Sequence, residues 1–85
     1  MKKKVQRKSE IRKYYLSEFQ LYDGEAFVTF NIVAIDTSKN EITVAVSNRG
    51  GISVTTYDIL TDNNGYLYFE YGVDYKKIYT DDFEV

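Results

Sequence analysis

A run of β-forming residues at 26–36 (AFVTFNIVAID) constrains the fold of this chain more than any other feature. Nearly every residue in the run is β-branched, aromatic or small and apolar, and it contains no Gly or Pro, which favours a strand over a helix. Residues 42–47 (ITVAVS) then alternate apolar and small polar side chains, the period of a half-buried antiparallel strand. The polar residues 36–40 between the two runs are typical of a hairpin loop. The sequence therefore predicts a long central β-hairpin.

Turn signals recur along the rest of the chain. Asp23-Gly24 favours a two-residue hairpin turn, the adjacent glycines at 50 and 51 suit another tight turn, and residues 62–65 (DNNG) form a third. Strands are expected at 52–57, 66–71 and 75–79, followed by a terminal turn at 80–83 that docks Phe83 under the sheet. This spacing predicts an all-β or mainly β fold, as a single small antiparallel meander or a partly open barrel of five to six strands.

The N-terminal part of the chain allows two readings. Residues 14–22 alternate in the manner of a strand, and this is the preferred prediction. Ile11, Tyr15, Phe19 and Tyr22 also form a helical stripe, so a helix at 8–21 is the alternative. Residues 1–13 are too charged to join the core and are predicted to be a flexible basic arm or one or more frayed helical turns, with 14–85 as one β-rich domain.

The strand periodicity also predicts a core made of one face of each strand. The expected core residues are Phe27 or Val28, Phe30, Ile32, Val44, Val46, Val54, Leu67 and Phe69.

The net charge of −2 hides a division between two parts of the chain. Residues 1–13 contain seven basic residues and one acidic residue, a net charge of +6, whereas residues 14–85 contain four basic and twelve acidic residues, a net charge of −8. Such asymmetry indicates a charged partner, although a solvated arm that keeps the protein soluble would have the same composition.

Residue types that carry chemistry are scarce. The chain has no Cys and no His, which removes disulfides, thiolate chemistry, the usual zinc ligands and the commonest general base. The DNNG turn does not fit a calcium loop, because Leu60 falls where that loop needs its first carboxylate. We therefore expect no enzymatic activity, no cofactor and no metal. The sequence also contains no run of signal-peptide or transmembrane length, so a cytoplasmic protein without membrane association is expected.

The tyrosines of the C-terminal third are the first functional lead. On a strand, Tyr66 and Tyr68 share the face opposite Leu67 and Phe69 and could stand exposed as a pair, unless they complete the small core. Exposed aromatic pairs serve as base-stacking platforms and as anchors in protein interfaces. The acidic residues around them repel phosphate, which favours a basic protein as the partner. The predicted partner-binding residues are Tyr66, Tyr68, Glu70, Asp74, Asp81 and Asp82.

In its size, acidity and lack of catalytic residue types, the whole chain resembles the small accessory proteins of phages and mobile elements. This group includes inhibitors of CRISPR effectors and of restriction systems, some of which act as DNA mimics. The resemblance is one of general character and is carried by no motif. It implies a non-catalytic protein that inhibits or modulates a nucleic-acid-handling complex.

An alternative function is nucleic-acid binding through the basic arm, assisted by exposed tyrosines. The residues that would contact phosphate are Lys2, Lys3, Lys4, Arg7, Lys8, Arg12 and Lys13. An exposed edge strand could also pair two copies into a homodimer.

Overall fold

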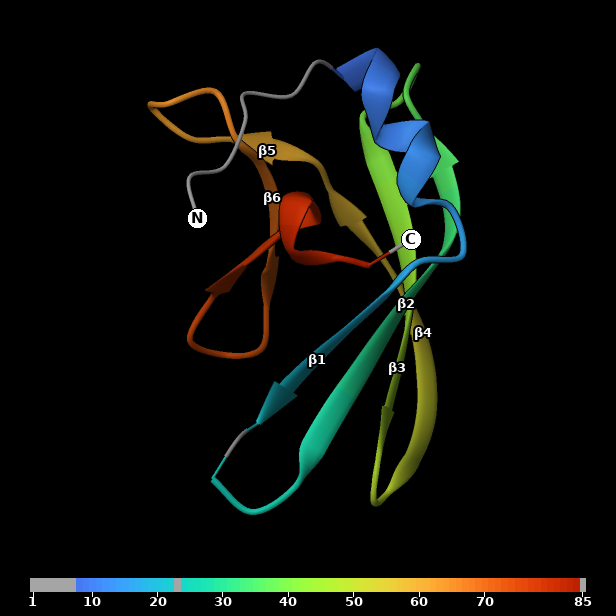
Figure 1. The fold of residues 1–85 in the computed structure, drawn as a ribbon, viewed down its shortest axis with the longest axis vertical. Helices are drawn as coiled ribbons and strands as arrows, with labels where there is room; N and C mark the ends of the chain where they lie inside the picture. The colour runs from blue at the N-terminus through green and yellow to red at the C-terminus, as the bar shows by residue number, and fades with distance from the viewer. Residues whose placement is uncertain (1–7, 23, 85) are drawn as a thin grey trace.

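The computed structural model describes residues 8–22 and 24–84, with side chains from Ile11 onward. Strands dominate this part of the chain, which confirms the predicted mainly β fold (Figure 1). They are β1 (Glu18–Tyr22), β2 (Phe27–Asp36), β3 (Glu41–Asn48), β4 (Gly51–Asp58), β5 (Leu60–Thr61), β6 (Leu67–Tyr71) and β7 (Lys76–Tyr79). Two 3-10 helices, η1 (Lys8–Tyr14) and η2 (Thr80–Asp82), precede β1 and follow β7.

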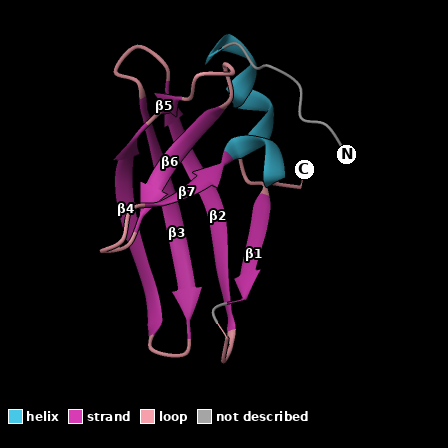
Figure 2. Cartoon of the chain, turned by 90° about the vertical axis from the view of Figure 1, so that its left-hand side faces the viewer, coloured by secondary structure: helices cyan, strands magenta, loops and turns pink. Residues whose placement is uncertain are grey.

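The strands form two separate antiparallel sheets in meander order. The large sheet has the order β1-β2-β3-β4, and the small sheet has the order β5-β6-β7. Figure 2 shows the small sheet crossing the upper part of the large sheet, while the tips of the β1–β2 and β3–β4 hairpins extend beyond it. The meander prediction is confirmed, but the described strands do not close into a barrel.

The central hairpin is present as predicted. β2 pairs with β3 from Thr29 opposite Ser47 to Asp36 opposite Glu41, with a bulge between Ile32 and Ala34. Asp36 organises the connecting loop, because its Oδ1 accepts hydrogen bonds from the Ser38 and Lys39 backbone N–H groups at 3.1 and 3.2 Å.

The core lies between the two sheets. Of the predicted core residues, Val28, Phe30, Ile32, Val44, Val46, Leu67 and Phe69 are buried. Phe83 is buried as well, in agreement with the predicted docking of the terminal turn. The core also contains residues absent from the predicted set, namely Ile11, Tyr14, Ile42, Ile59 and Ile78.

The prediction of Val54 as a core residue is wrong, since its side chain is 63% exposed. β3 and β4 are joined by the two residues Arg49 and Gly50, so that Asn48 pairs with Gly51 and Val54 pairs with Ala45. Directly opposed residues point to the same face of a sheet. Val54 therefore lies with Ala45 on the face that points away from the small sheet, which we call the outer face.

The N-terminal segment combines the two structures considered for it. A strand forms, but only from Glu18, and the preceding residues Lys8–Tyr14 form η1. Ile11 and Tyr14 are buried in the core, so the expectation that residues up to 13 stay outside it is wrong for Ile11. The β1–β2 connection also differs from the expected two-residue turn, since Tyr22 pairs with Phe27 and four residues rather than two separate these partners in the sequence.

We predict that Val44→Asp unfolds the protein, whereas Val54→Asp leaves it folded. An unpaired carboxylate at the buried Val44 site costs several kcal/mol, a large part of the roughly 5–15 kcal/mol that stabilises a typical domain. The same substitution at the exposed Val54 site buries no charge. Urea denaturation followed by circular dichroism measures both variants at low protein concentration. Equal losses of stability would contradict the assignment of β4 faces.

Candidate partner-binding face

Three tyrosines cluster on the small sheet, on the side away from the core. Tyr68 of β6 pairs with Tyr79 of β7 on one side and with Leu60 of β5 on the other. The ring centroid of Tyr79 lies 5.4 Å from that of Tyr68 and 6.5 Å from that of Tyr66. Tyr66 and Tyr68 therefore share a face as predicted, but both are half-buried against Tyr79 rather than fully exposed. We call this surface the tyrosine face and define it by Tyr66, Tyr68, Glu70 and Tyr79.

Asp62 holds the tyrosine face in place. Its Oδ1 accepts hydrogen bonds from the backbone N–H groups of Asn64 at 2.9 Å and Tyr66 at 3.0 Å. Its Oδ2 accepts the hydroxyl hydrogen of Tyr79 at 3.0 Å. One carboxylate thus shapes the turn that leads into β6 and also fixes a side chain of β7.

These hydrogen bonds shift the pKa values of both partners. The pKa of Asp62 is lowered, chiefly because the Tyr66 backbone N–H stabilises the carboxylate. The pKa of the Tyr79 hydroxyl is raised, first by burial and then by its hydrogen bond to Asp62. Asp62 is therefore an ionised structural group of the tyrosine face.

A cation also contacts this face. Glu70 lies opposite Lys77 in the β6–β7 pair, and the Lys77 Nζ is 5.1 Å from the centroid of the Tyr68 ring, within the range of a cation–π contact. Lys77 offsets the charge of Glu70 and covers part of the Tyr68 ring.

The other three predicted partner-binding residues are spread over different surfaces. Asp74 is exposed in the loop between β6 and β7. Asp81 Oδ1 accepts the hydroxyl hydrogen of Tyr14 at 3.2 Å, which ties it to the end of η1. Asp82 lines a pocket beside β1 together with Glu18 and Glu84. The structure thus brings together Tyr66, Tyr68 and Glu70, and it adds Tyr79 and Asp62, which are not among the predicted partner-binding residues.

Only the end of the predicted nucleic-acid arm can be described. Lys2, Lys3, Lys4 and Arg7 lie outside the described residues, as does the side chain of Lys8. Arg12 and Lys13 are exposed on η1. Arg12 donates a hydrogen bond to Thr37 Oγ1 at 3.4 Å, and the Lys13 Nζ is 5.2 Å from the Tyr14 ring centroid.

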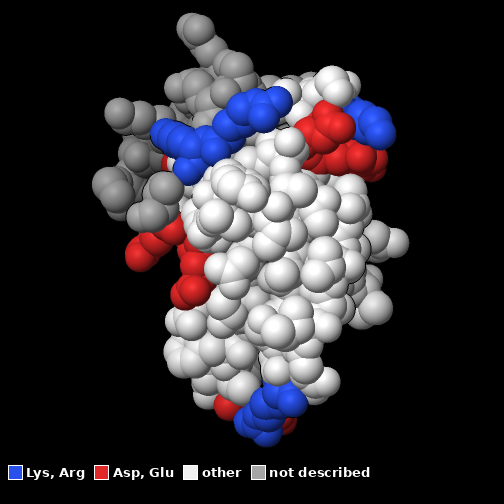
Figure 3. All heavy atoms as spheres, turned by 90° about the vertical axis from the view of Figure 1, so that its right-hand side faces the viewer, with Lys and Arg blue, Asp and Glu red and all other residues white. Residues whose placement is uncertain are grey.

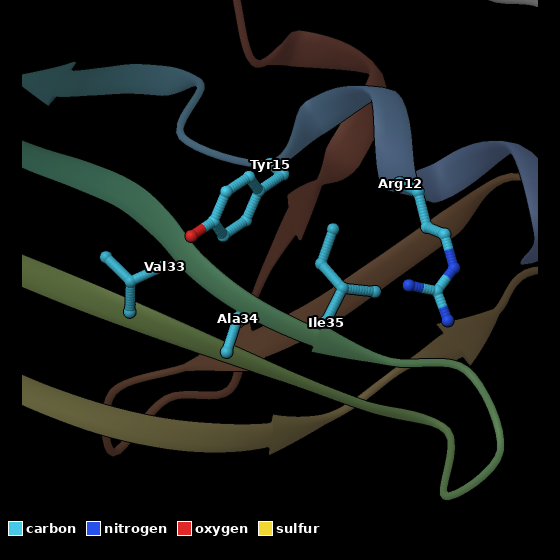
Figure 4. Close-up of a pocket in the computed structure, with 5 residues that line it drawn as sticks. All are labelled: Arg12, Tyr15, Val33, Ala34 and Ile35. Carbon is cyan, nitrogen blue, oxygen red and sulfur yellow. The ribbon is translucent and has the colours of Figure 1, made fainter.

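A surface pocket lies where η1 approaches β2. It has a volume of about 440 Å³ and is lined by Arg12, Tyr15, Val33, Ala34 and Ile35. In Figure 4, Arg12 and Tyr15 flank Ile35 above the strand. These residues offer one guanidinium and one phenol beside aliphatic groups.

Other classes of site have little support among residues 8–22 and 24–84. No group of three or more acidic side chains there is arranged to hold a metal ion. That part of the chain also contains no helix of sufficient length and apolar character to cross a membrane. The class defined by the structure is that of a small protein with two antiparallel β-sheets. Comparison of the chain with protein-family models, curated proteins and solved structures finds no match.

We predict that Asp62 makes the stability of the protein dependent on pH in the acid range. The folded pKa of Asp62 lies below its ordinary value of 3.8, so its contribution is present above about pH 4 and is lost as pH falls through the folded pKa. Asp62→Ala should lower the midpoint of thermal unfolding at pH 7, and its difference from the wild type should shrink below about pH 4.

Two variants control this measurement. Asp62→Asn keeps an acceptor oxygen without the charge, so it should retain more stability than the alanine variant at pH 7. Asp74→Ala removes an exposed carboxylate and should leave the midpoint unchanged. A constant difference between wild type and Asp62→Ala down to pH 2 would contradict the assigned role.

Proposed function

We propose that the protein is a non-catalytic binding protein whose tyrosine face engages a basic protein partner. The observation that carries the proposal is the cluster of Tyr66, Tyr68 and Tyr79, held on a small sheet by Asp62. Tyrosines fixed in this way lose little conformational entropy on binding and supply a large contact area, as interface hot spots do.

Charge supports a basic partner. Residues 59–84 contain six acidic residues against two basic ones. The net negative charge of this part of the chain speeds the encounter with a positive surface, while the desolvated rings supply most of the affinity. A nucleic-acid-handling complex offers such a positive surface, and we propose that this protein inhibits or modulates one. The accessory proteins of phages and mobile elements, including anti-CRISPR and anti-restriction proteins, are the general type.

Affinity purification from the native host tests the proposal. Wild-type protein should recover a basic, nucleic-acid-binding protein that excess DNA displaces. The double variant Tyr66→Ser/Tyr68→Ser should lose this partner, because truncating two anchors typically costs at least about 2 kcal/mol of binding. Tyr22→Ser is the matched control, because Tyr22 is 58% exposed on the large sheet. Equal recovery by the double variant and the control would overturn the proposal.

The alternative function, nucleic-acid binding by the arm, predicts a different result. Arg12 and Lys13 are exposed and continue the basic run of residues 2–8. Removing residues 1–13 would also remove Ile11 from the core, so loss of binding on that truncation would be ambiguous. A variant that combines deletion of residues 1–7 with Arg12→Gln and Lys13→Gln keeps Ile11. We call it the charge-depleted variant.

We predict that wild-type protein shows no salt-dependent binding to DNA or RNA beyond that of the charge-depleted variant. If the arm binds duplex DNA, the logarithm of affinity should fall with the logarithm of salt concentration with a slope of about −0.9 per phosphate neutralised. Fluorescence anisotropy at several salt concentrations measures that slope. A steep slope that disappears in the charge-depleted variant would favour the alternative function.

A further inference from the structure

The edge strand β4 is exposed along most of its length. Residues 51–56 are exposed on both faces of the sheet, because β4 extends beyond the part of the large sheet that the small sheet covers (Figure 2). Ile52 and Val54 are 73% and 63% exposed. Residues 51–57 (GISVTTY) carry no charge and no proline, so they lack the devices that usually prevent edge strands from pairing.

Along β4, backbone groups that bond to β3 alternate with backbone groups that point away from it. Ile59 N–H donates to the Asn40 carbonyl at 2.8 Å, so Ile59 and Asn40 form a hydrogen-bonded pair. In an antiparallel ladder, every second pair of opposed residues is hydrogen-bonded in this way. With the register of β3 and β4, Ser53, Thr55 and Tyr57 therefore bond to β3. The backbone N–H and C=O groups of Ile52, Val54 and Thr56 point outward from the sheet.

The opposite edge of the large sheet is shorter and partly paired. β1 has only five residues and begins with a charged residue, Glu18. Glu18 N–H donates to the Glu84 carbonyl at 3.1 Å, and Glu84 N–H donates to the Glu18 carbonyl at 2.8 Å. β4 is therefore the longer open edge of this sheet.

Opposite charges flank the uncharged part of β4. At one end Asp36, Glu41 and Asp58 lie in a row across β2, β3 and β4. Adjacent like charges in such a row repel each other. At the other end Arg49 is exposed in the β3–β4 turn, where its Nη2 donates to the Glu25 carbonyl at 3.3 Å. Figure 3 shows the uncharged centre of the outer face, with charged side chains gathered near its two ends.

We propose that two copies of this chain pair through their β4 strands, antiparallel and about a two-fold axis at Val54. Ile52 then lies opposite Thr56 of the second copy, and the outward N–H and C=O groups of Ile52, Val54 and Thr56 bond across the axis. Asp58 lies opposite Gly50 of the second copy, next to that copy's Arg49. In this register Arg49 of one copy exchanges its hydrogen bond to its own Glu25 carbonyl for the Asp58 carboxylate of the other copy, and the symmetry makes this contact twice.

The pairing of Arg49 with Asp58 favours a second copy of the same chain as the partner of the β4 edge. Residues 14–85 have a net charge of −8, so two copies repel each other over much of their surfaces. In this register no charged residue of β4 lies opposite a residue of like charge, and Asp58 lies diagonal to Arg49 of the other copy at both ends. Pairing of one edge strand is a small contact beside the roughly 1,000 Å² of a stable interface, so we expect a weak dimer. The tyrosine face is on the other sheet, so this inference does not rest on the proposed function.

Sedimentation equilibrium over a concentration series tests the dimer. Val54→Lys places two ammonium groups at the axis and should raise the dissociation constant by about tenfold or more. Gln20→Lys is the matched control, because it adds the same charge to the outer face at the opposite edge of the sheet, on β1. Arg49→Glu and Asp58→Arg should each weaken the dimer, and the double charge reversal should restore it.

Hydrogen exchange at high and low protein concentration locates the contact. The amides of Ile52, Val54 and Thr56 should become protected only at high concentration. Those of Ser53 and Thr55 should be protected at both, because they bond to β3. The proposal is overturned by a monomer at all concentrations, or by a dimer that Val54→Lys and Gln20→Lys weaken equally.

Discussion

The contact between Phe30 of the large sheet and Phe69 of the small sheet is the interaction on which the rest of the structure depends. Both rings are fully buried, with centroids 6.3 Å apart. Tyr71 meets Phe30 edge to face at 4.9 Å, and Phe83 lies 6.3 Å from Phe69. A chain of 85 residues without Cys has no disulfide to join its sheets, and at this size the core must be well filled. Aromatic rings fill it with few residues, because each buries a large area.

The small sheet exists because of this contact. Its strands have two, five and four residues, too few to be stable in water without packing against another layer. The tyrosine face is the reverse side of the same strands, since Leu67 and Phe69 alternate with Tyr66 and Tyr68 along the chain. A substitution that loosens the core beneath β6 would therefore disturb the tyrosine face even though it touches none of the tyrosines.

The sequence predicted the features that local patterns determine and missed those that depend on pairing or on distant contacts. The alternation at 42–47 correctly gave Val44 and Val46 as core residues. Val54 was assigned to the wrong face, because the face depends on the pairing register that follows the Arg49-Gly50 turn. Ile11 was left out of the core because it lies among basic residues, yet together with Tyr14 it anchors η1 to the core.

The same limit applies to the candidate site. Tyr66 and Tyr68 were grouped correctly because they are two residues apart on an extended segment, but Tyr79 joins them only through the β6–β7 register. Asp62 was recognised as a turn residue, and its Asx-type hydrogen bonds were foreseeable from the DNNG pattern. The hydrogen bond between Asp62 and Tyr79, which are 17 residues apart, was not foreseeable, because it depends on the tertiary structure.

The two proposed surfaces are geometrically compatible. A two-fold axis that pairs antiparallel edge strands runs perpendicular to the sheet, so each face of one copy continues into the same face of the other. The small sheets of both copies would then cover the same side of one continuous sheet formed from two four-stranded sheets. Both tyrosine faces would be carried on that side, on a rigid support rather than a flexible linker. A partner with two basic sites at matching separation would bind such a dimer with avidity, whereas a partner with one site would bind monomer and dimer alike.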